Sequence, residues 1–547
     1  MLRIRNLGVG VALAALTALP AARQEPKPGN TWYEDKVDLG FKVKAPKDWD
    51  FVPGSPLERN LIGKYADPGE GKYVSLGNDA EIIAEILLVK FDRRGGEKKE
   101  KRQVGDQTVE LSTKGLENVG KWMELGLDEG AGWHKVEGPT PLKNALPEAT
   151  FSIYEGTSTR RNASGAEPQP VRAFVASFPL SAELDVALIG LGPAGKKWRP
   201  FESAYTTIAK TLQPVKLEGT SGASSTDAGD PRSEKRAKLQ ADIAKNPGWS
   251  LYETPNYFIV SCYDDKQFIE EMKLRLEGIR QVYERDYPPS IARKIRPREL
   301  ADGDQKKAGA PEAAQDPDQT VAKKVAIDAL ELGKNSVVRL CKDRGQYLQY
   351  GGREKTSGYF SSMEGELVIF DDKQDQGRDH TWGVMNHEGF HQYIHAFFGN
   401  ISPHSWYNEG TGDYYSGFEF NLKTKKFTPK KEIGRQDNLL RIRDNYVPLR
   451  EFVTWTKVQY YGRNSGGIKG DGKALEGWAL YAQGWSMIWF LRTGAGKAKG
   501  WQASWGTILD VYLDTLLETA DLAQAVKKAF EGVDWDAFEK SWNDYSM

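Results

Sequence analysis

A polar, low-complexity segment near the middle of the chain divides the sequence into two parts. Residues 215–246 are rich in Ser, Gly, Asp and Lys and contain the run GTSGASSTDAGDP. Such a composition cannot form a packed core and is typical of a flexible linker, with room for a short helix at its end. Because 547 residues exceed one ordinary domain, we expect separate domains at 31–214 and 247–547. A second low-complexity stretch, 300–323, predicts a disordered insertion in the second domain.

The first 22 residues have the pattern of an export signal. Arg3 and Arg5 supply positive charge, residues 7–19 are apolar or small, and small residues suited to cleavage occupy 18–22. The alternative is a membrane anchor, but an apolar run of about 13 residues is short for a span, which needs about 20. We therefore expect an exported protein (periplasmic, cell-surface or extracellular) that is not stably inserted in a membrane after cleavage.

Charge and cysteine content exclude several classes of protein. Lys and Arg total 75 and Asp and Glu total 76, so no net positive charge attracts nucleic acid or an anionic membrane. Two cysteines, Cys262 and Cys341, are too few for a disulfide-rich scaffold or a cysteine-ligated metal site. Each cysteine stands at the end of an expected strand. Either the two form a disulfide between neighbouring strands or both are free thiols. The oligomeric state is open as well.

The first domain is predicted to be a small α/β unit. Residues 39–43 alternate apolar and polar side chains, as in a half-buried strand. Further strands are expected at 80–91, which also fits a helix, and at 171–178 and 184–191, whereas 201–212 has helical apolar spacing. The opening GFKVKAPKDW and the closing FESAYTTIAKTLQPV resemble small α/β sandwich domains of the Mog1/photosystem-II extrinsic-protein type. That resemblance implies an accessory or substrate-presenting domain without catalytic residues.

The second domain mixes strands and helices. Strands are expected at 257–262, 336–341, 358–361 and 366–370, and an amphipathic helix at 266–283. Further helices are expected at 381–398, from about 406, and at 475–491. We therefore predict an α+β protein in which a mixed sheet and its helices form the second domain.

The motif His387-Glu388-Gly389-Phe390-His391 lies within an expected helix. Four residues turn about 400° along an α-helix and rise about 6 Å, so both histidine rings leave the same face. That spacing lets two imidazoles bind one zinc ion at about 2.0–2.1 Å each. Glu388 is adjacent to the first histidine, where it can take a proton from a water molecule at the metal. The motif therefore predicts a zinc-dependent hydrolytic site.

A third ligand is expected from the following helix. HExxH followed 18 positions later by a helical Glu, here Glu409, resembles the gluzincin, or thermolysin-like, metallopeptidases. NHEGFHQYIH, WYNEGTGDYYSG and YAQGWSMIWFL are similar to the peptidase-MA-like gluzincin family of bacterial exported proteins, over about residues 247–547. The resemblance implies a zincin-like fold, a peptide or protein substrate, and Zn²⁺ held by His387, His391 and Glu409. It also implies Glu388 as general base and Asp413 as the carboxylate that hydrogen-bonds a ligand histidine.

Two assignments in this site stay open. GTGDYYSG also resembles the GTxDxxYG motif of aspzincins, in which Asp413 would be the third ligand, although Ser416 stands where that motif has Tyr. The reaction also needs a hydrogen-bond donor for the oxyanion, usually a later Tyr or His in gluzincins. Tyr481 is our first choice, within a helix where core packing is the competing role. The alternatives are Tyr460, Tyr461 and His404.

Other features near the motif have simpler interpretations. Residues 366–370 (ELVIF) precede the motif helix and are expected to form an edge strand, along which a peptide can lie by strand addition. His395 lies about 12 Å along the helix from His387, too far to share its metal ion, so a structural or ligand-supporting role is expected. His380 precedes the helix and is expected to be a surface residue or a neighbour of the helix cap. The Gly-rich run 462–473 predicts a mobile loop.

These patterns together favour an exported zinc metallopeptidase. A catalytically inactive zinc-binding surface or scaffold protein is one alternative, in which the N-terminal domain binds a partner. The other is a zinc amidase that acts on a non-protein amide such as peptidoglycan.

Overall fold

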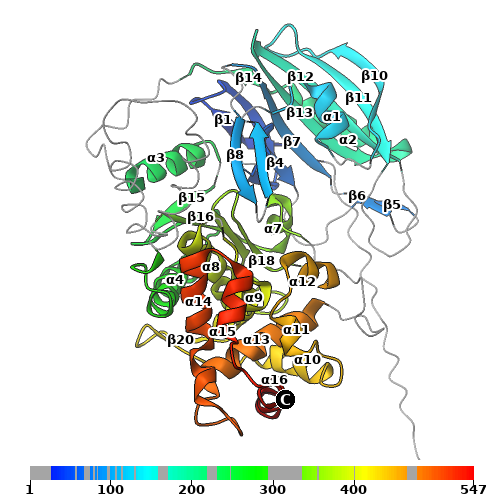
Figure 1. The fold of residues 1–547 in the computed structure, drawn as a ribbon. Coiled ribbons are helices and arrows are strands. Elements are labelled where there is room, and N and C mark those ends of the chain that lie inside the picture. Colours follow the sequence, from blue (N-terminus) through cyan, green and yellow to red (C-terminus); the bar gives the residue numbers. More distant parts are fainter. Residues whose placement is uncertain are drawn as a thin grey trace, which may run out of the picture.

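The structure is a computed structural model that describes residues 26–292, 335–464 and 477–547 with short gaps. The gaps lie at 56–57, 67–73, 78–79, 83, 95–98, 105–106, 113–114, 128–130, 158–169, 218–230, 247, 354–355 and 400. The expected export signal and the expected insertion at 300–323 therefore fall outside the described residues, as does most of the expected loop at 462–473. The described part is α+β, with an N-terminal region dominated by strands and a C-terminal region dominated by helices (Figure 1).

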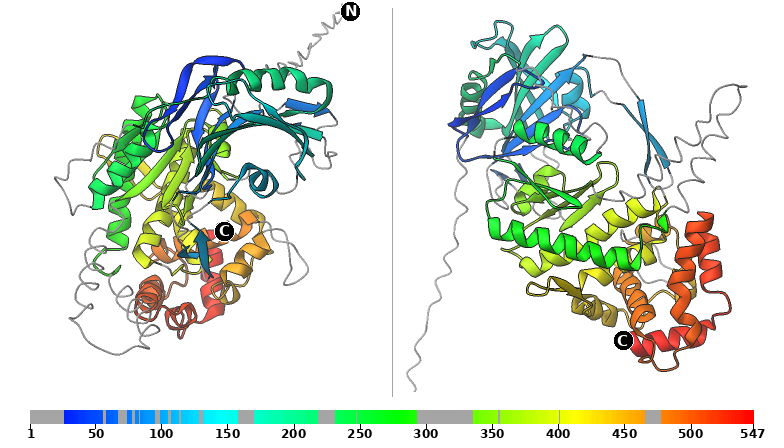
Figure 2. Two further views of the ribbon diagram at one scale, coloured as in Figure 1. Left: turned by 90° about the horizontal axis from the view of Figure 1, so that it is seen from above. Right: turned by 90° about the vertical axis from the view of Figure 1, so that its left-hand side faces the viewer.

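The largest sheet described in the N-terminal region has seven antiparallel strands, in the order β10-β11-β12-β13-β7-β4-β3. Its strands are β3 (Asp50–Pro53), β4 (Leu61–Ala66), β7 (Glu85–Asp92), β10 (His134–Pro141), β11 (Thr150–Thr157), β12 (Pro170–Ser181) and β13 (Leu184–Pro193). Helix α2 (Trp198–Ala209) lies along the curved sheet (Figure 2) and buries Phe201, Tyr205 and Ile208 in the core. Every strand pair in this sheet is antiparallel.

A second sheet of five strands carries the C-terminal region, in the order β15-β16-β17-β19-β18. Strands β16 (Tyr257–Ser261), β17 (Ser336–Cys341) and β19 (Glu366–Phe370) are parallel and buried along their whole length. Their sequences are apolar runs rather than alternating patterns because both faces are covered. Strands β15 (Ser250–Glu253) and β18 (Gly358–Ser361) pair antiparallel at the two edges.

The expectation that 366–370 forms an edge strand is wrong. β18 lies outside β19, because the short turn between them folds the chain back along the outer side of β19. That turn ends at Gly365, whose φ of +70° favours glycine. The open edge of the sheet next to the motif helix is therefore β18.

Helix α8 (Arg378–Phe398) lies between the sheet and the C-terminal helices. Its first half packs with the sheet core through Trp382 and Met385, and its second half packs with the helical core through Phe390, Ile394 and Phe397. The apolar spacing of the second half thus anchors the motif, as the helical pattern predicts. The other helices that position the site are α4 (Lys266–Asp286), α9 (Ser405–Ser416), α10 (Ile433–Arg441), α12 (Lys457–Asn464) and α13 (Gly477–Thr493).

The expected linker is in part a helix. α3 (Pro231–Ala244) occupies the second half of 215–246, and Arg236 pairs with Glu253 of β15 at 2.7 Å. Lys, Arg, Glu and Gln all have good helix propensity, and the structure has the expected helix at the end of this segment. Cys262 and Cys341 are free thiols, although β16 and β17 are neighbours.

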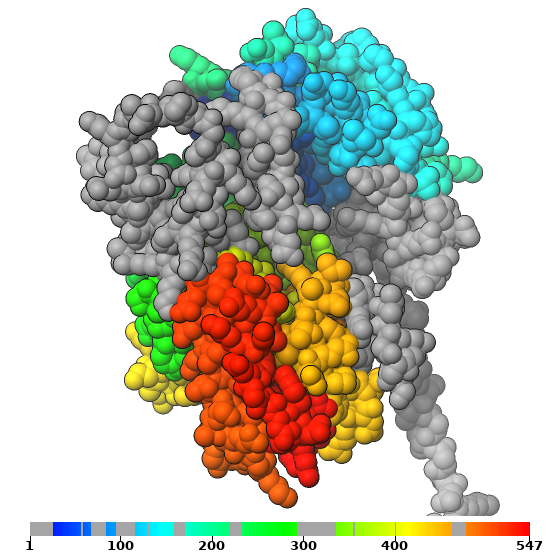
Figure 3. All heavy atoms as spheres, viewed as in Figure 1, coloured from blue at the N-terminus to red at the C-terminus, as the bar shows by residue number. Residues whose placement is uncertain are grey.

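The N-terminal and C-terminal regions occupy the two halves of the molecule (Figure 3). Direct contacts join them. The indole N–H of Trp249, which is 6% exposed, donates to the carbonyl of Phe51 at 3.0 Å. Ser55, just after β3, hydrogen-bonds Glu364 in the turn between β18 and β19. The N-terminal sheet therefore rests on the same turn that positions the edge strand. Within the described ranges, every helix is too short or too polar to span a lipid bilayer.

Candidate metal centre

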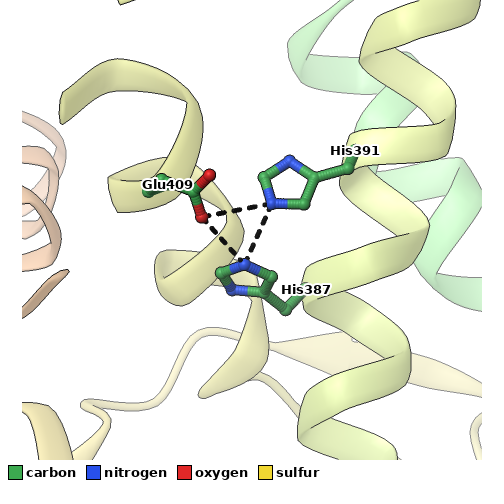
Figure 4. Close-up of side chains that lie close together, drawn as sticks. All are labelled: His387, His391 and Glu409. Atoms are coloured by element: carbon green, nitrogen blue, oxygen red, sulfur yellow. Dashed lines mark hydrogen bonds and ion pairs between the residues drawn. The ribbon is translucent and has the colours of Figure 1, made fainter. Parts of the chain in front are cut away.

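Three side chains from two helices converge on one point (Figure 4). His387 and His391 lie one turn apart on α8, and Glu409 lies on α9. The two histidine Nε2 atoms are 3.0 Å apart, and each is 3.3 Å from Glu409 Oε2. Across the described residues, this is the one group of three potential ligands with its donor atoms within 4.8 Å of one another.

These separations fit a tetrahedral metal ion. Donor atoms about 2.05 Å from a tetrahedral centre lie about 3.3 Å from one another. Two imidazole nitrogens and a carboxylate oxygen repel one another at this distance unless a proton or a cation lies between them. Burial would raise the pKa of Glu409, but the adjacent His391 and His387 hold that pKa well below its usual range. The three residues could therefore hold a divalent ion.

Asp413 contacts the ring nitrogen of His387 that does not face Glu409. Asp413 Oδ1 lies 3.0 Å from His387 Nδ1, so His387 Nε2 is left to face Glu409. Arg435 of α10 pairs with the same carboxylate through both oxygens, with Nη2–Oδ1 at 2.9 Å and Nε–Oδ2 at 2.8 Å. Burial lowers the pKa of His387, but the hydrogen bond and charge of Asp413 raise it well above its usual value. This geometry favours Glu409 over Asp413 as the third ligand.

Glu388 faces the open edge of the sheet. It is half-buried on α8, and its Oε2 accepts a hydrogen bond from the Phe360 backbone N–H at 3.0 Å. Phe360 pairs with Leu367 in the β18–β19 ladder. Because its N–H is directed to Glu388, that N–H points away from β19. The expected general base therefore lies between the ligand helix and the edge strand.

Tyrosines of α12 and α13 surround the ligand group. The Tyr461 hydroxyl donates to Glu409 Oε1, the oxygen that does not face the histidines. The Tyr481 ring centre lies 6.5 Å from that of His387, and the Arg435 guanidinium lies 5.3 Å over the Tyr481 ring. Burial raises the pKa of Tyr481, and the charge of Glu409 raises it further, so its hydroxyl stays protonated. Tyr460 is buried against both of these tyrosines.

The other histidines near the motif do not join the ligand group. His404 precedes α9 and is 7% exposed; its Nδ1 hydrogen-bonds the Tyr512 hydroxyl at 2.9 Å. Burial lowers the pKa of His404 to about 4, so it is a neutral core residue and a poor candidate for the oxyanion donor. The His395 ring packs against Phe360. His380 is half-buried in the first turn of α8.

A cavity of about 230 Å³ opens beside His391 and Glu409. The C-terminal end of α8 and residues 401–403 form one part of its wall. Phe360 and Ser362 of the edge-strand hairpin and the first turns of α12 form the rest. The ligand group therefore borders a space large enough for part of a substrate.

Sequence reasoning missed two residues that support the ligands. Asn408 Oδ1 lies 3.3 Å from His391 Nδ1, as Asp413 does for the other histidine. Its position next to Glu409 offered a signal, because each metal-bound histidine usually has such a partner. Arg435 lies 22 positions beyond Asp413, on a separate helix, and no motif marks it.

Comparison with known proteins identifies no family. No family model and no curated protein matches the chain. One solved structure that aligns with it is LpqN, a protein involved in cell envelope biogenesis of Mycobacterium tuberculosis. The two are 11% identical, the alignment covers 34% of this chain and 87% of LpqN, and the TM-score is 0.20.

Proposed function

We propose that this protein is an exported zinc metallopeptidase with a gluzincin-like catalytic domain. The observation that carries the proposal is the convergence of His387, His391 and Glu409, with donor atoms 3.0–3.3 Å apart beside Glu388. Two imidazoles and one carboxylate suit zinc among the divalent metals. Three protein ligands leave a fourth position open, as catalytic sites require.

The residues of the chain supply the steps of amide hydrolysis. When bound, zinc would polarise the scissile carbonyl and lower the pKa of water. Glu388 would accept the proton of the attacking water and pass it to the leaving amine. Tyr481 would donate a hydrogen bond to the oxyanion, with Tyr461 as the alternative. Asp413 would hold the His387 ring with Nε2 toward the metal.

The edge strand favours a peptide as the substrate. β18 is short and open on one side, and the outward N–H of Phe360 lies at Glu388. An extended peptide can pair with such an edge through its backbone. A backbone carbonyl of the peptide would accept the hydrogen bond from the Phe360 N–H. The Glu388 carboxylate would then be free to act as the general base. Export rests on the charged and apolar pattern of residues 1–22, and an accessory role is proposed for the N-terminal region.

The test compares the wild-type protein with Glu388→Gln and His391→Ala. Elemental mass spectrometry should find near one zinc per chain in the wild type and in Glu388→Gln, and a loss of zinc in His391→Ala. Hydrolysis of a peptide library should fall at least about 100-fold in Glu388→Gln, because the general base is lost. Full activity in Glu388→Gln would contradict the proposal. Zinc without hydrolysis of any peptide would favour the scaffold protein.

A further inference from the structure

In the part of the chain that the structure describes, the cavity beside the ligand group has one charged lining residue that does not belong to that group, Lys457. Its titratable lining residues are His391 and Glu409 of the ligand group, together with His395, Lys457 and Tyr461. Glu409 faces both ligand histidines and accepts the Tyr461 hydroxyl, so it is committed to the metal centre. Among the described lining residues, no other carboxylate is present to balance Lys457.

Lys457 lies at the rim of this cavity. Its ammonium is 6.0 Å from the centre of the Tyr461 ring, and its side chain is exposed. Ser362 and Ser402 add hydroxyl groups to the lining, and His395 adds a ring nitrogen. A carboxylate that entered the cavity would find an opposite charge and several hydrogen-bond donors. A lysine or arginine side chain would instead be repelled by Lys457 and by a divalent ion bound to the ligand group.

β18 runs along α8 in the same direction as the helix. Gly358, at the start of β18, lies against α8, because a Cβ atom on it would be 2.5 Å from Val384 Cγ1. Two residues later the Phe360 ring packs against His395, with ring centres 5.5 Å apart. The cavity begins where β18 ends, since Ser362 and the C-terminal end of α8 both line it.

The direction of β18 decides which part of a substrate reaches the cavity. Antiparallel pairing is more stable than parallel pairing, so a peptide added to β18 would run from the cavity toward Gly358. Residues before the scissile bond would then lie at the cavity. We infer that the cavity selects peptides with an acidic side chain on the N-terminal side of the scissile bond. This inference rests on the proposed peptidase function.

The test uses the full chain loaded with zinc and peptides that differ at one position. One series places Glu, Gln or Lys before the scissile bond, and a second series places them after it. We expect kcat/KM about 2- to 5-fold higher for Glu than for Gln in the first series, and lower for Lys. Lys457→Glu should reverse this order. Lys497→Glu makes the same charge change on an exposed loop outside the cavity lining and should leave the order unchanged.

The outcomes separate this inference from the proposed function. Hydrolysis without a preference for Glu, or a preference that survives Lys457→Glu, would overturn the inference and leave the peptidase standing. A preference for Glu after the scissile bond would also overturn it. If no peptide is hydrolysed, the binding of the same peptides to zinc-loaded Glu388→Gln still tests the cavity. Equal affinity for the Glu and Lys peptides would then overturn the inference.

Discussion

Asp413 contacts Nδ1 of the His387 ring, and Arg435 pairs with the Asp413 carboxylate. Asp413→Asn keeps the shape of the side chain but removes its charge. We expect zinc affinity to fall about 10- to 100-fold, because the carboxylate orients the ligand ring and raises its basicity. Competition with a chromogenic chelator measures this. Asp437→Asn, an exposed change on α10, is the control, and equal zinc affinity in the two variants would contradict the assigned role.

Tyr481 and Tyr461 are the two candidates for the proposed oxyanion donor. Tyr481→Phe should lower kcat about 10²- to 10³-fold with little change in KM, because the hydrogen bond forms only in the transition state. Tyr461→Phe removes the hydrogen bond to Glu409 and should mainly weaken zinc binding. Steady-state kinetics and zinc titration of both variants separate the two roles. A large loss of kcat in Tyr461→Phe alone would assign the donor to Tyr461.

The position of Glu409 depends on how closely α9 approaches α13. A Cβ atom on Gly410 would lie 2.5 Å from the Gly484 carbonyl oxygen, so the two backbones are in direct contact. Gly410→Ala should push the helices apart, with a loss of about 1–3 kcal/mol in the free energy of unfolding. Zinc affinity should fall as well, since Glu409 moves with α9. Denaturant unfolding and zinc titration measure the two effects.

Gly383→Ala on α8 is the matched control for this prediction. A Cβ atom there would lie 3.4 Å from the Ser416 carbonyl oxygen, an ordinary contact. Alanine also has the higher helix propensity, so the stability of this variant should be unchanged or slightly raised. If both alanine variants behave alike, the contact between α9 and α13 does not set the position of Glu409.

Features that depend on the spacing of nearby residues could be predicted from the sequence. Features that depend on which elements pack or pair together could not. The HExxH spacing and Glu409 follow from one helix turn and one motif, and the structure brings all three ligand residues together. The order of β18 and β19 depends on which strand pairs with β17, which neither strand's own sequence specifies. A helix was expected at the end of the linker, but the sequence of α3 does not specify its contact with β15 through the pair between Arg236 and Glu253.

At the scale of the whole molecule, the metal would join two helices that the chain connects only through residues 399–404. Zinc that binds the folded state alone stabilises it, by about 2.7 kcal/mol at a concentration 100 times Kd. We expect removal of the metal by a chelator to lower the unfolding temperature of the wild type. The unfolding temperature of His391→Ala should not respond to chelator or zinc. A response equal to that of the wild type would place the stabilising metal elsewhere.

The hydrogen bond between Ser55 and Glu364 joins the N-terminal region to the turn between β18 and β19. The turn that contains Glu364 sets the position of β18, where the substrate is proposed to bind. A ligand of the N-terminal sheet that moves Ser55 would therefore change the affinity for substrate. By linkage, substrate would change the affinity for that ligand by the same factor. The contact between the two regions would then be an allosteric coupling, measurable from either end of the molecule.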